Sequence, residues 1–355
     1  MKLTYTHGGE IYDKQIQYDF SVNVNPFGLP KQAEEAIAGG LSSCHIYPDT
    51  KCEKLRQSLG EHCQIDASAI MCGNGASDLL FRAVMAWRPR QACIVSPAFV
   101  EYTKALKSVG CEISHYMLKP RGDTWEIQED LLDWLGHRGV DLLILTNPGN
   151  PFGNGIFVDK MTEILNFCGE HHICVIVDEC FMDFVKEKER YSVLDWMRKR
   201  IAQKNKGPVV LLKAFTKFYG MAGLRLGYCI NSDLSLLEKM ELCGPDWSVN
   251  GLSQLGGIAA LSQKDYERET IVYIEKERKY MTEQLEREHY KVYSSIANFL
   301  CFRGSPSLYE KMMGRGILIR QCENFEGLDK TFYRIGIKTR KENDILLDQL
   351  RQCVT

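Results

Sequence analysis

The chain has 355 residues, enough for one large domain and a smaller one. Its 44 basic and 46 acidic residues nearly cancel, so no global field favours nucleic acid or an anionic membrane, and anion binding must be local. Fourteen cysteines lie scattered through apolar runs, so we expect reduced thiols in a cytoplasmic protein. No apolar run approaches membrane-spanning length, so we expect the protein to be soluble. We also expect no metal site.

Between residues 69 and 230, short apolar runs alternate with segments long enough for a helix. Their continuous apolarity is typical of strands that helices cover on both faces. The runs are, in chain order, "AIMCGNG", "QACIVSP", "CEISHYML", "VDLLILTNP", "ICVIVDE", "PVVLLKAF" and "GYCIN". They predict an α/β domain with a mostly parallel seven-stranded sheet between helices.

From about Gly244 the pattern changes. A charged helical stretch over residues 264–289 precedes the strand-like pieces "YKVYSS", "NFLCFR", "GILIRQC" and "FYRIGI". This predicts a smaller α+β C-terminal domain. We therefore expect an N-terminal arm over residues 1–30, a large domain over residues 31–243 and a small domain over residues 244–355.

Polar residues follow several of the predicted strands, where ligand sites of open α/β sheets lie. The motif "GNGASD" stands between a strand and a helix and could bind an anion, although alone it is more often a tight turn. Asp178 could keep a heterocyclic nitrogen protonated, and a desolvated Lys217 could be an amine nucleophile. Each of these residues alone is more often structural or solvated; together they predict a site.

The ordered series "GNGASD", "TNPGNPFG", "DEC" and "TKFYGMAGLRLG" resembles the pyridoxal-phosphate-dependent class I/II aminotransferases of fold type I, across nearly the whole chain. The resemblance implies that Lys217 carries the cofactor as an internal aldimine, that Asp178 pairs with its ring nitrogen and that Tyr102 stacks on its ring. Further implied cofactor contacts are Gly75, Ala76, Ser77, Asn150, Thr216, Arg225 and, from the neighbouring subunit of a homodimer, Tyr47. Implied substrate contacts are His7, Asn25, Arg320 and Arg334.

Two positions depart from the commoner pattern of that family. Phe181 stands where a tyrosine often contacts the phenolic oxygen of the cofactor, and Ala214 stands where a serine or threonine usually contacts the phosphate. Thr216 could partly replace the second contact. Neither departure removes a catalytic group that the resemblance requires.

Other stretches resemble the threonine-phosphate decarboxylases within the family: "THGGEIYD", "DFSVNVNPFGLP", "GILIRQCENFEGL" and "YRIGIKTRKENDILL". This implies decarboxylation of O-phospho-L-threonine to (R)-1-aminopropan-2-yl phosphate, a step of cobalamin synthesis, through an external aldimine. A substrate phosphate needs a second anion site, for which His7, Arg320, Arg334, Lys338 and Arg340 are candidates. The alternatives are a histidinol-phosphate or other amino-acid aminotransferase and, less favoured, a non-catalytic regulator that binds pyridoxal phosphate.

Overall fold

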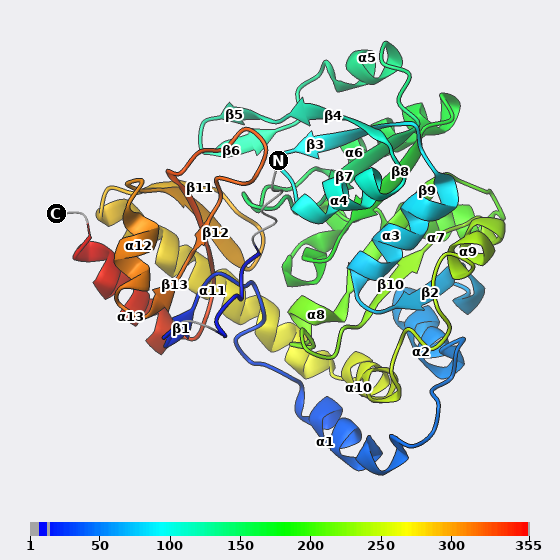
Figure 1. The fold of residues 1–355 in the computed structure, drawn as a ribbon, viewed down its shortest axis with the longest axis horizontal. Helices are drawn as coiled ribbons and strands as arrows, with labels where there is room; N and C mark the ends of the chain where they lie inside the picture. The colour runs from blue at the N-terminus through cyan, green and yellow to red at the C-terminus, as the bar shows by residue number, and fades with distance from the viewer. Residues whose placement is uncertain (1–6, 13–14, 354–355) are drawn as a thin grey trace.

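The computed structural model describes residues 7–12 and 15–353. Its central sheet has the strand order β2-β10-β9-β8-β7-β3-β4 (Figure 1). The strands are β2 (Ile70–Gly73), β3 (Gln91–Ser96), β4 (Glu112–Met117), β7 (Leu142–Thr146), β8 (Cys174–Asp178), β9 (Val209–Ala214) and β10 (Gly227–Ile230). β10 runs antiparallel to both of its neighbours, and the other adjacent pairs are parallel. The mostly parallel seven-stranded sheet is therefore confirmed.

Helices cover both faces of this sheet. One face packs against α3 (Ala76–Trp87), α4 (Val100–Ser108) and α9 (Leu234–Glu241), and the other against α2 (Glu53–Cys63), α5 (Leu131–Gly136), α6 (Val158–Glu170) and α7 (Leu194–Ala202). Along β7, Leu142 and Ile144 belong to one core, whereas Leu143 and Leu145 belong to the other, because successive side chains of a strand alternate. Burial on both faces explains why the predicted strands read as continuous apolar runs.

A four-stranded antiparallel sheet forms the centre of the C-terminal part. Its order is β11 (Lys291–Tyr293), β12 (Phe299–Arg303), β15 (Phe332–Gly336) and β14 (Arg320–Gln321), accompanied by α12 (Leu308–Met313) and α13 (Arg340–Arg351). The long helix α11 (Lys264–Arg287) packs on this part through one stripe of buried residues at helical spacing: Thr270, Ile274, Glu277, Met281 and Leu285. The predicted smaller α+β part is confirmed.

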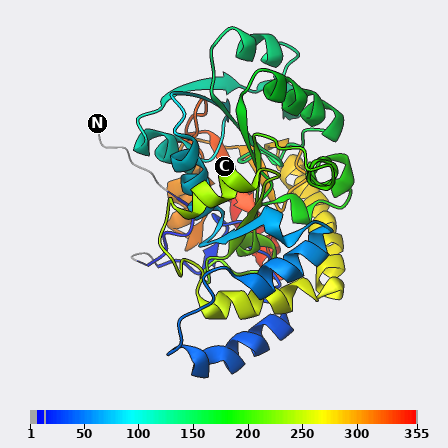
Figure 2. The same cartoon turned by 90° about the vertical axis from the view of Figure 1, so that its right-hand side faces the viewer.

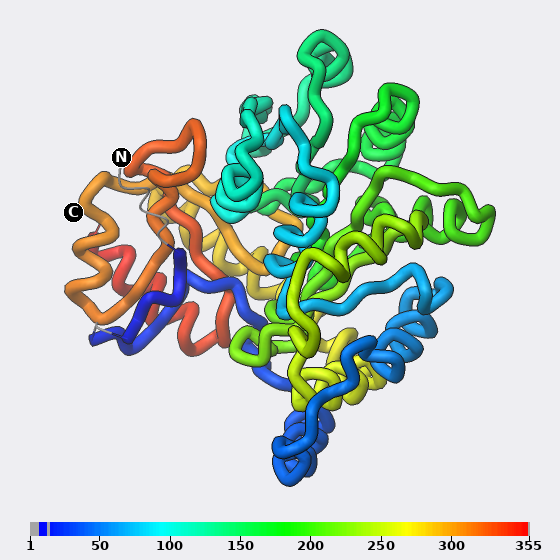
Figure 3. Tube along the Cα trace, turned by 45° about the vertical axis from the view of Figure 1, so that its right-hand side comes forward, coloured from blue at the N-terminus to red at the C-terminus, as the bar shows by residue number. Residues whose placement is uncertain are grey.

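The N-terminal arm joins the C-terminal part. Its strand β1 (Tyr18–Asp19) pairs in parallel with β13 (Ile317–Leu318), and Figure 3 shows the dark blue arm beside the orange and red segments. The chain then enters α1 (Lys31–Gly40), which packs on α10 (Gly251–Leu261) along the foot of the molecule in Figure 2. The predicted boundaries at residues 30 and 243 thus fall just before α1 and in the turn between α9 and α10.

The remaining elements are short. A hairpin of β5 (Lys119–Arg121) and β6 (Thr124–Glu126) follows β4, and α8 (Phe215–Phe218) follows β9. None of the helices in the described ranges is long and apolar enough to cross a membrane.

Candidate functional site

A cavity of about 320 Å³ opens at the carboxyl ends of the central strands. The N-terminal arm, the first turn of α3, α4 and strand β15 complete its walls. It brings together residues that are far apart in the chain and that the sequence predicted as site residues: His7, Ala76, Ser77, Tyr102, Asn150, Asp178, Thr216, Lys217, Arg225 and Arg334. The cavity is thus the candidate active site.

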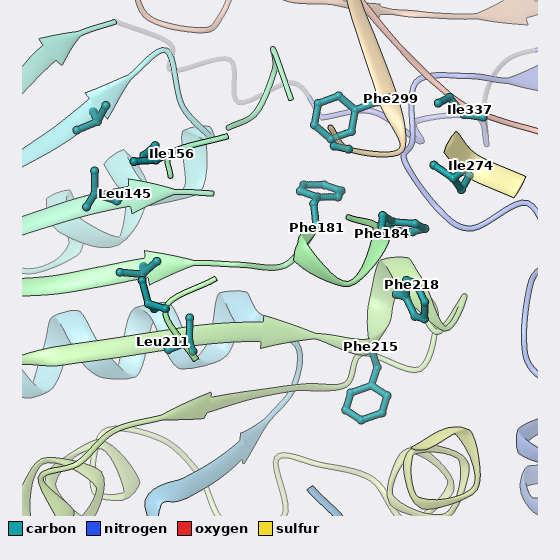
Figure 4. Packing of buried hydrophobic residues seen from close by; sticks show 14 of the residues in the cluster. Leu145, Ile156, Phe181, Phe184, Leu211, Phe215, Phe218, Ile274, Phe299 and Ile337 are labelled. Atoms are coloured by element: carbon teal, nitrogen blue, oxygen red, sulfur yellow. The ribbon is translucent and has the colours of Figure 1, made fainter. Parts of the chain in front are cut away.

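Lys217 reaches the cavity from α8, directly after the buried strand β9. Aromatic packing fixes this turn: Phe218 meets Phe184 edge to face at a centroid distance of 5.0 Å, and Phe215 points to the other side (Figure 4). Burial, followed by the nearby positive charge of Arg334, lowers the pKa of Lys217 to about 8. A substantial fraction of the amine is therefore neutral near physiological pH and able to act as a nucleophile.

Asp178 ends β8 and points into the same cavity. Its Oδ2 accepts a 2.7 Å hydrogen bond from the Tyr102 hydroxyl, and its Oδ1 accepts one of 2.9 Å from the backbone N–H of Cys180. Burial, reinforced by the Asp178 carboxylate, raises the pKa of Tyr102 well above its ordinary value, so its hydroxyl remains a donor. These bonds orient a buried carboxylate toward any ligand in the cavity.

The junction where β2 leads into α3 has the features of an anion site. Gly75 has a φ of +81°, and a Cβ there would lie 2.7 Å from Nη2 of Arg225, so this position requires glycine. Arg225 itself has a φ of +61°, an uncommon conformation for a residue with a side chain. The first residues of α3 and Arg225 line the same cavity, and the N–H groups of a helix N-terminus beside a guanidinium favour an anion.

Arg334 on β15 supplies a second positive group. Its Nη1 donates a 2.6 Å hydrogen bond to Oδ1 of Asn150, and its Nη2 donates one of 2.7 Å to the Ser21 carbonyl. Its Nε is buried and has no hydrogen-bond partner in the described part of the chain. Burial lowers the pKa of Arg334 to about 10, yet it remains charged at neutral pH. A buried guanidinium with an unsatisfied N–H can bind a carboxylate.

A second cavity of about 600 Å³ adjoins the first. The two share His7, Gly8 and Ser21 as a common wall, and Arg320 lines the second one together with the acidic residues Glu10 and Glu323. Nη2 of Arg320 donates a 2.6 Å hydrogen bond to Oδ1 of Asn324.

The imidazole of His7 in this shared wall lies 3.1 Å from a carboxylate oxygen of Glu101, and its ring packs 5.8 Å from that of Phe99. These contacts hold His7 of the N-terminal arm against α4 and the residue before it. The second cavity offers space for a polar group attached to a ligand of the first.

Three predicted site residues do not line either cavity: Gly75, which adjoins Arg225 as described above, Asn25 and Tyr47. Asn25 is buried, and its amide donates to the Phe218 carbonyl, the Tyr266 hydroxyl and the Thr270 hydroxyl, while its backbone N–H donates to the Lys217 carbonyl. It therefore holds the turn that carries Lys217.

Tyr47, by contrast, is 78% exposed and packs against Trp247 at a centroid distance of 4.8 Å. It is available to a neighbouring molecule and does not reach the cavity of its own chain.

Two further candidates for anion binding also lie elsewhere. Arg340 forms two-pronged hydrogen bonds with the buried carboxylate of Glu277 and lies 3.5 Å over the Tyr280 ring, which is a structural role in the C-terminal part. Burial lowers the pKa of Lys338, and neither cavity is lined by it.

Sequence reasoning missed several lining residues. Asn23 is buried, lines the cavity and has no partner for either amide atom within the described chain. Thr146 and Cys180 also line it, and their positions at the ends of β7 and β8 could have revealed them. No comparable signal separates Asn23 from Asn25 in "NVNP".

The two departures from the family pattern both face the cavity. Phe181 packs edge to face on Phe299 with 5.0 Å between ring centroids, and Figure 4 shows the two rings facing each other. Ala214 contributes only a methyl group, while Thr216 brings a hydroxyl to the same wall. The cavity therefore lacks the phenol expected near a phenolic oxygen but retains one hydroxyl near the anion site.

Comparisons with known proteins identify the family of the chain. The family model for aminotransferase class I and II matches residues 15–350. A threonine-phosphate decarboxylase of Salmonella typhimurium is 34% identical over 341 residues, which cover 95% of this chain and 91% of the relative. The crystal structure of a histidinol-phosphate aminotransferase from Clostridium acetobutylicum superposes with a TM-score of 0.85 at 29% identity and covers 95% of this chain and 99% of that one.

A second solved structure has the same fold. Histidinol-phosphate aminotransferase from Sinorhizobium meliloti in complex with pyridoxal-5'-phosphate superposes with a TM-score of 0.84 at 20% identity and covers 96% of this chain and 91% of that one. At this identity the likeness concerns the fold alone. Together with the family match, the cavity and its lysine at the end of a central strand lead to one conclusion: the chain belongs to the class I and II aminotransferases, pyridoxal-phosphate-dependent enzymes of fold type I that include lyases and transaminases.

Proposed function

We propose that Lys217, Asp178 and the start of α3 hold pyridoxal phosphate in the cavity. Three features fit this group: the anion site between Gly75 and Arg225, the oriented Asp178 carboxylate, and a lysine amine whose pKa lies near 8. Lys217 would bond to the aldehyde carbon, and Arg225 would meet the phosphate. Ala76, Ser77 and Thr216 would add hydrogen bonds to the phosphate, and Asn150 would face the phenolic oxygen.

We further propose that the enzyme decarboxylates O-phospho-L-threonine. The observation that carries decarboxylation is the 34% identity to a threonine-phosphate decarboxylase. The second cavity supports a phosphorylated substrate, because a phosphate remote from the reacting carbon needs a second anion site, and Arg320 and His7 line this cavity. The product would be (R)-1-aminopropan-2-yl phosphate, as in cobalamin synthesis.

The residues of this chain would divide the work as follows. When bound, pyridoxal phosphate supplies a ring that accepts the electron pair released at the substrate α-carbon. Asp178 holds a proton on the ring nitrogen, and the Tyr102 hydroxyl keeps that carboxylate in place. Arg334 binds the substrate carboxylate, and the Lys217 amine delivers a proton to the α-carbon after carbon dioxide has left.

The orientation of the substrate decides which bond breaks. If the residues of this chain hold the substrate carboxylate in the reactive position, carbon dioxide would leave. Two anchors, Arg334 for the carboxylate and Arg320 for the phosphate, would fix this orientation. If the same anchors instead placed the α-hydrogen within reach of the Lys217 amine, Lys217 would remove that proton and the reaction would be transamination.

Transamination of histidinol phosphate is the second candidate. It is favoured by the TM-score of 0.85 to a histidinol-phosphate aminotransferase, which exceeds the 0.79 obtained with a threonine-phosphate decarboxylase structure from Porphyromonas gingivalis. Both substrates carry a remote phosphate, so the second cavity does not separate them. The need for a 2-oxo acid does.

The test is incubation of the cofactor-loaded protein with O-phospho-L-threonine and no oxo acid, followed by assay of carbon dioxide and aminopropanol phosphate. The proposal expects many turnovers per active site. Absence of carbon dioxide, together with consumption of histidinol phosphate only when 2-oxoglutarate is present, would replace it with the aminotransferase. The variant Lys217→Ala serves as the control for uncatalysed reaction.

We also propose a homodimer in which Tyr47 completes the partner's phosphate site. An exposed apolar group on and beside the loop before α2 supports this proposal: Leu41, Ile46, Tyr47, Leu242 and Trp247. Sedimentation equilibrium should give twice the chain mass, and Tyr47→Phe should weaken cofactor binding without changing that mass. A monomer that retains full activity would contradict it.

The fourteen unpaired cysteines support a reducing compartment, and we propose the cytoplasm.

A further inference from the structure

A buried ion pair lies behind the proposed cofactor residues. Lys213 on β9 and Glu179 after β8 are almost completely buried, with Nζ and Oε2 3.6 Å apart. The Lys213 amine also donates a 3.0 Å hydrogen bond to Oδ1 of Asp183. Burial alone would lower the pKa of Lys213, yet the Asp183 and Glu179 carboxylates raise it above its ordinary value. The Lys213 side chain is therefore protonated at neutral pH and carries its positive charge in the interior of the protein.

Strand alternation puts Lys213 on the far side of the sheet from the cavity. Leu212 and Ala214 line the catalytic cavity, and Lys213 between them lines a separate cavity of about 90 Å³ instead. The helix α8, which carries Lys217, follows directly after this strand. Lys213 thus makes no contact with a ligand of the catalytic cavity, but it anchors the strand end that presents the lysine.

Glu179 anchors the neighbouring strand end in the same way. It stands between Asp178 and Cys180, which line the catalytic cavity, and it lines none of the three cavities described above. One carboxylate oxygen accepts a 2.7 Å hydrogen bond from the Ser192 hydroxyl, and the other accepts one of 2.7 Å from the backbone N–H of Val193. These two hydrogen bonds hold the Glu179 side chain, and with it the backbone next to Asp178, from the side away from the catalytic cavity.

We propose that Lys213 and Glu179 are positioning residues that hold the Asp178 carboxylate and the Lys217 amine in register from the opposite face of the sheet. This inference rests on the proposed cofactor roles of those two residues but not on the identity of the substrate. Lys213→Met would leave the buried Glu179 carboxylate without its cation, and Glu179→Gln would leave Lys213 with only the Asp183 carboxylate of its two contacts, so the chain would relax around the changed charge. A displacement of about 1 Å at a catalytic group can lower the rate by roughly 100-fold.

The test is a pH titration of the bound cofactor's absorbance in Glu179→Gln and Lys213→Met. We expect both variants to bind the cofactor with a shifted titration midpoint and a kcat that is lower by roughly 10- to 100-fold, with less change in KM. Lys213→Arg, which keeps the charge, should restore the midpoint of the parent protein. The matched control is the surface pair Lys160 and Glu163 on α6, 2.8 Å apart, whose neutral variants should titrate like the parent.

A folded, cofactor-loaded Glu179→Gln protein with the midpoint and kcat of the parent would overturn the proposal. If Lys213→Met does not fold, Glu179→Gln and Lys213→Arg decide the question, because they preserve shape and charge respectively. The titration uses no substrate. It can therefore fail while decarboxylation persists, and it can succeed even if the enzyme proves to be a transaminase.

Discussion

The guanidinium of Arg334 donates a 2.6 Å hydrogen bond to the side chain of Asn150 and so joins β15 to the loop after β7. Its other terminal nitrogen bonds to the carbonyl of Ser21 in the N-terminal arm. Three distant segments of the chain therefore meet at one charged group in the wall of the active site. A substrate carboxylate bound there would contact a group whose direction all three segments fix.

Replacing Arg334 with lysine should weaken this contact. An ammonium is a point charge and cannot bond to Asn150, Ser21 and a carboxylate in the geometry of a planar fork. We expect a loss of about 2 kcal/mol of transition-state stabilisation, or roughly 30-fold in kcat/KM for O-phospho-L-threonine. Steady-state kinetics checks this, with Arg303→Lys on the exposed end of β12 as the control. An unchanged kcat/KM would remove Arg334 from the substrate site.

The second cavity predicts discrimination between phosphorylated and unphosphorylated substrates. Arg320→Met removes a charged donor there, and charge-assisted hydrogen bonds contribute about 1.5 to 3 kcal/mol. We expect KM for O-phospho-L-threonine to rise roughly 10- to 100-fold, while any slow turnover of L-threonine is unaffected. Arg315→Met, at an exposed arginine nearby, is the matched control. If both substrates suffer equally, Arg320 supports the fold and does not bind the phosphate.

Much of this fold follows from the sequence because both faces of the central sheet are buried. All seven apolar runs are strands, since a strand packed on both sides needs apolar residues at most of its positions; the edge strand β4, which is less buried, carries more polar residues. Their order in the sheet could not be predicted, because nothing local in "GYCIN" indicates that β10 runs antiparallel between β2 and β9. Strand neighbours are a property of the tertiary structure.

The site shows a similar division. Lys217, Asp178 and Arg225 follow strands or turns with motifs of their own, so their convergence on one cavity could be predicted. Asn25 and Asn23 could not be told apart, because they share one motif and differ only in what the tertiary structure places around them. The amide nitrogen of Asn25 donates to the Phe218 carbonyl next to Lys217 and to two hydroxyls of α11, whereas neither amide atom of Asn23 has a partner in the described residues.

Phe181→Tyr should restore the contact that this chain lacks. A phenol hydroxyl that donates to the cofactor's phenolic oxygen stabilises the negative charge there, so the bound cofactor's proton is held less tightly. We expect the pH midpoint of the cofactor absorbance to fall, with a small loss of stability where the new hydroxyl meets the buried ring of Phe299. Phe184→Tyr, in the same aromatic cluster but outside the cavity lining, is the control. A rise of the midpoint would contradict the assigned position of Phe181.

The pKa of Lys217 predicts how the apoprotein captures its cofactor. Only the neutral amine attacks the aldehyde of pyridoxal phosphate, and a folded-state pKa of about 8 in place of 10.5 makes the neutral form abundant at lower pH. At pH 7 roughly a tenth of such amines are neutral, against roughly one in three thousand for an ordinary lysine. The second-order capture rate, followed by absorbance, should therefore rise between pH 6 and 8 and level off above. Free lysine with the same aldehyde is the control, because it shares the ionisations of the cofactor, and its rate should keep rising to about pH 10. A capture rate of the protein that parallels that of free lysine would mean that burial and Arg334 do not depress the pKa of Lys217.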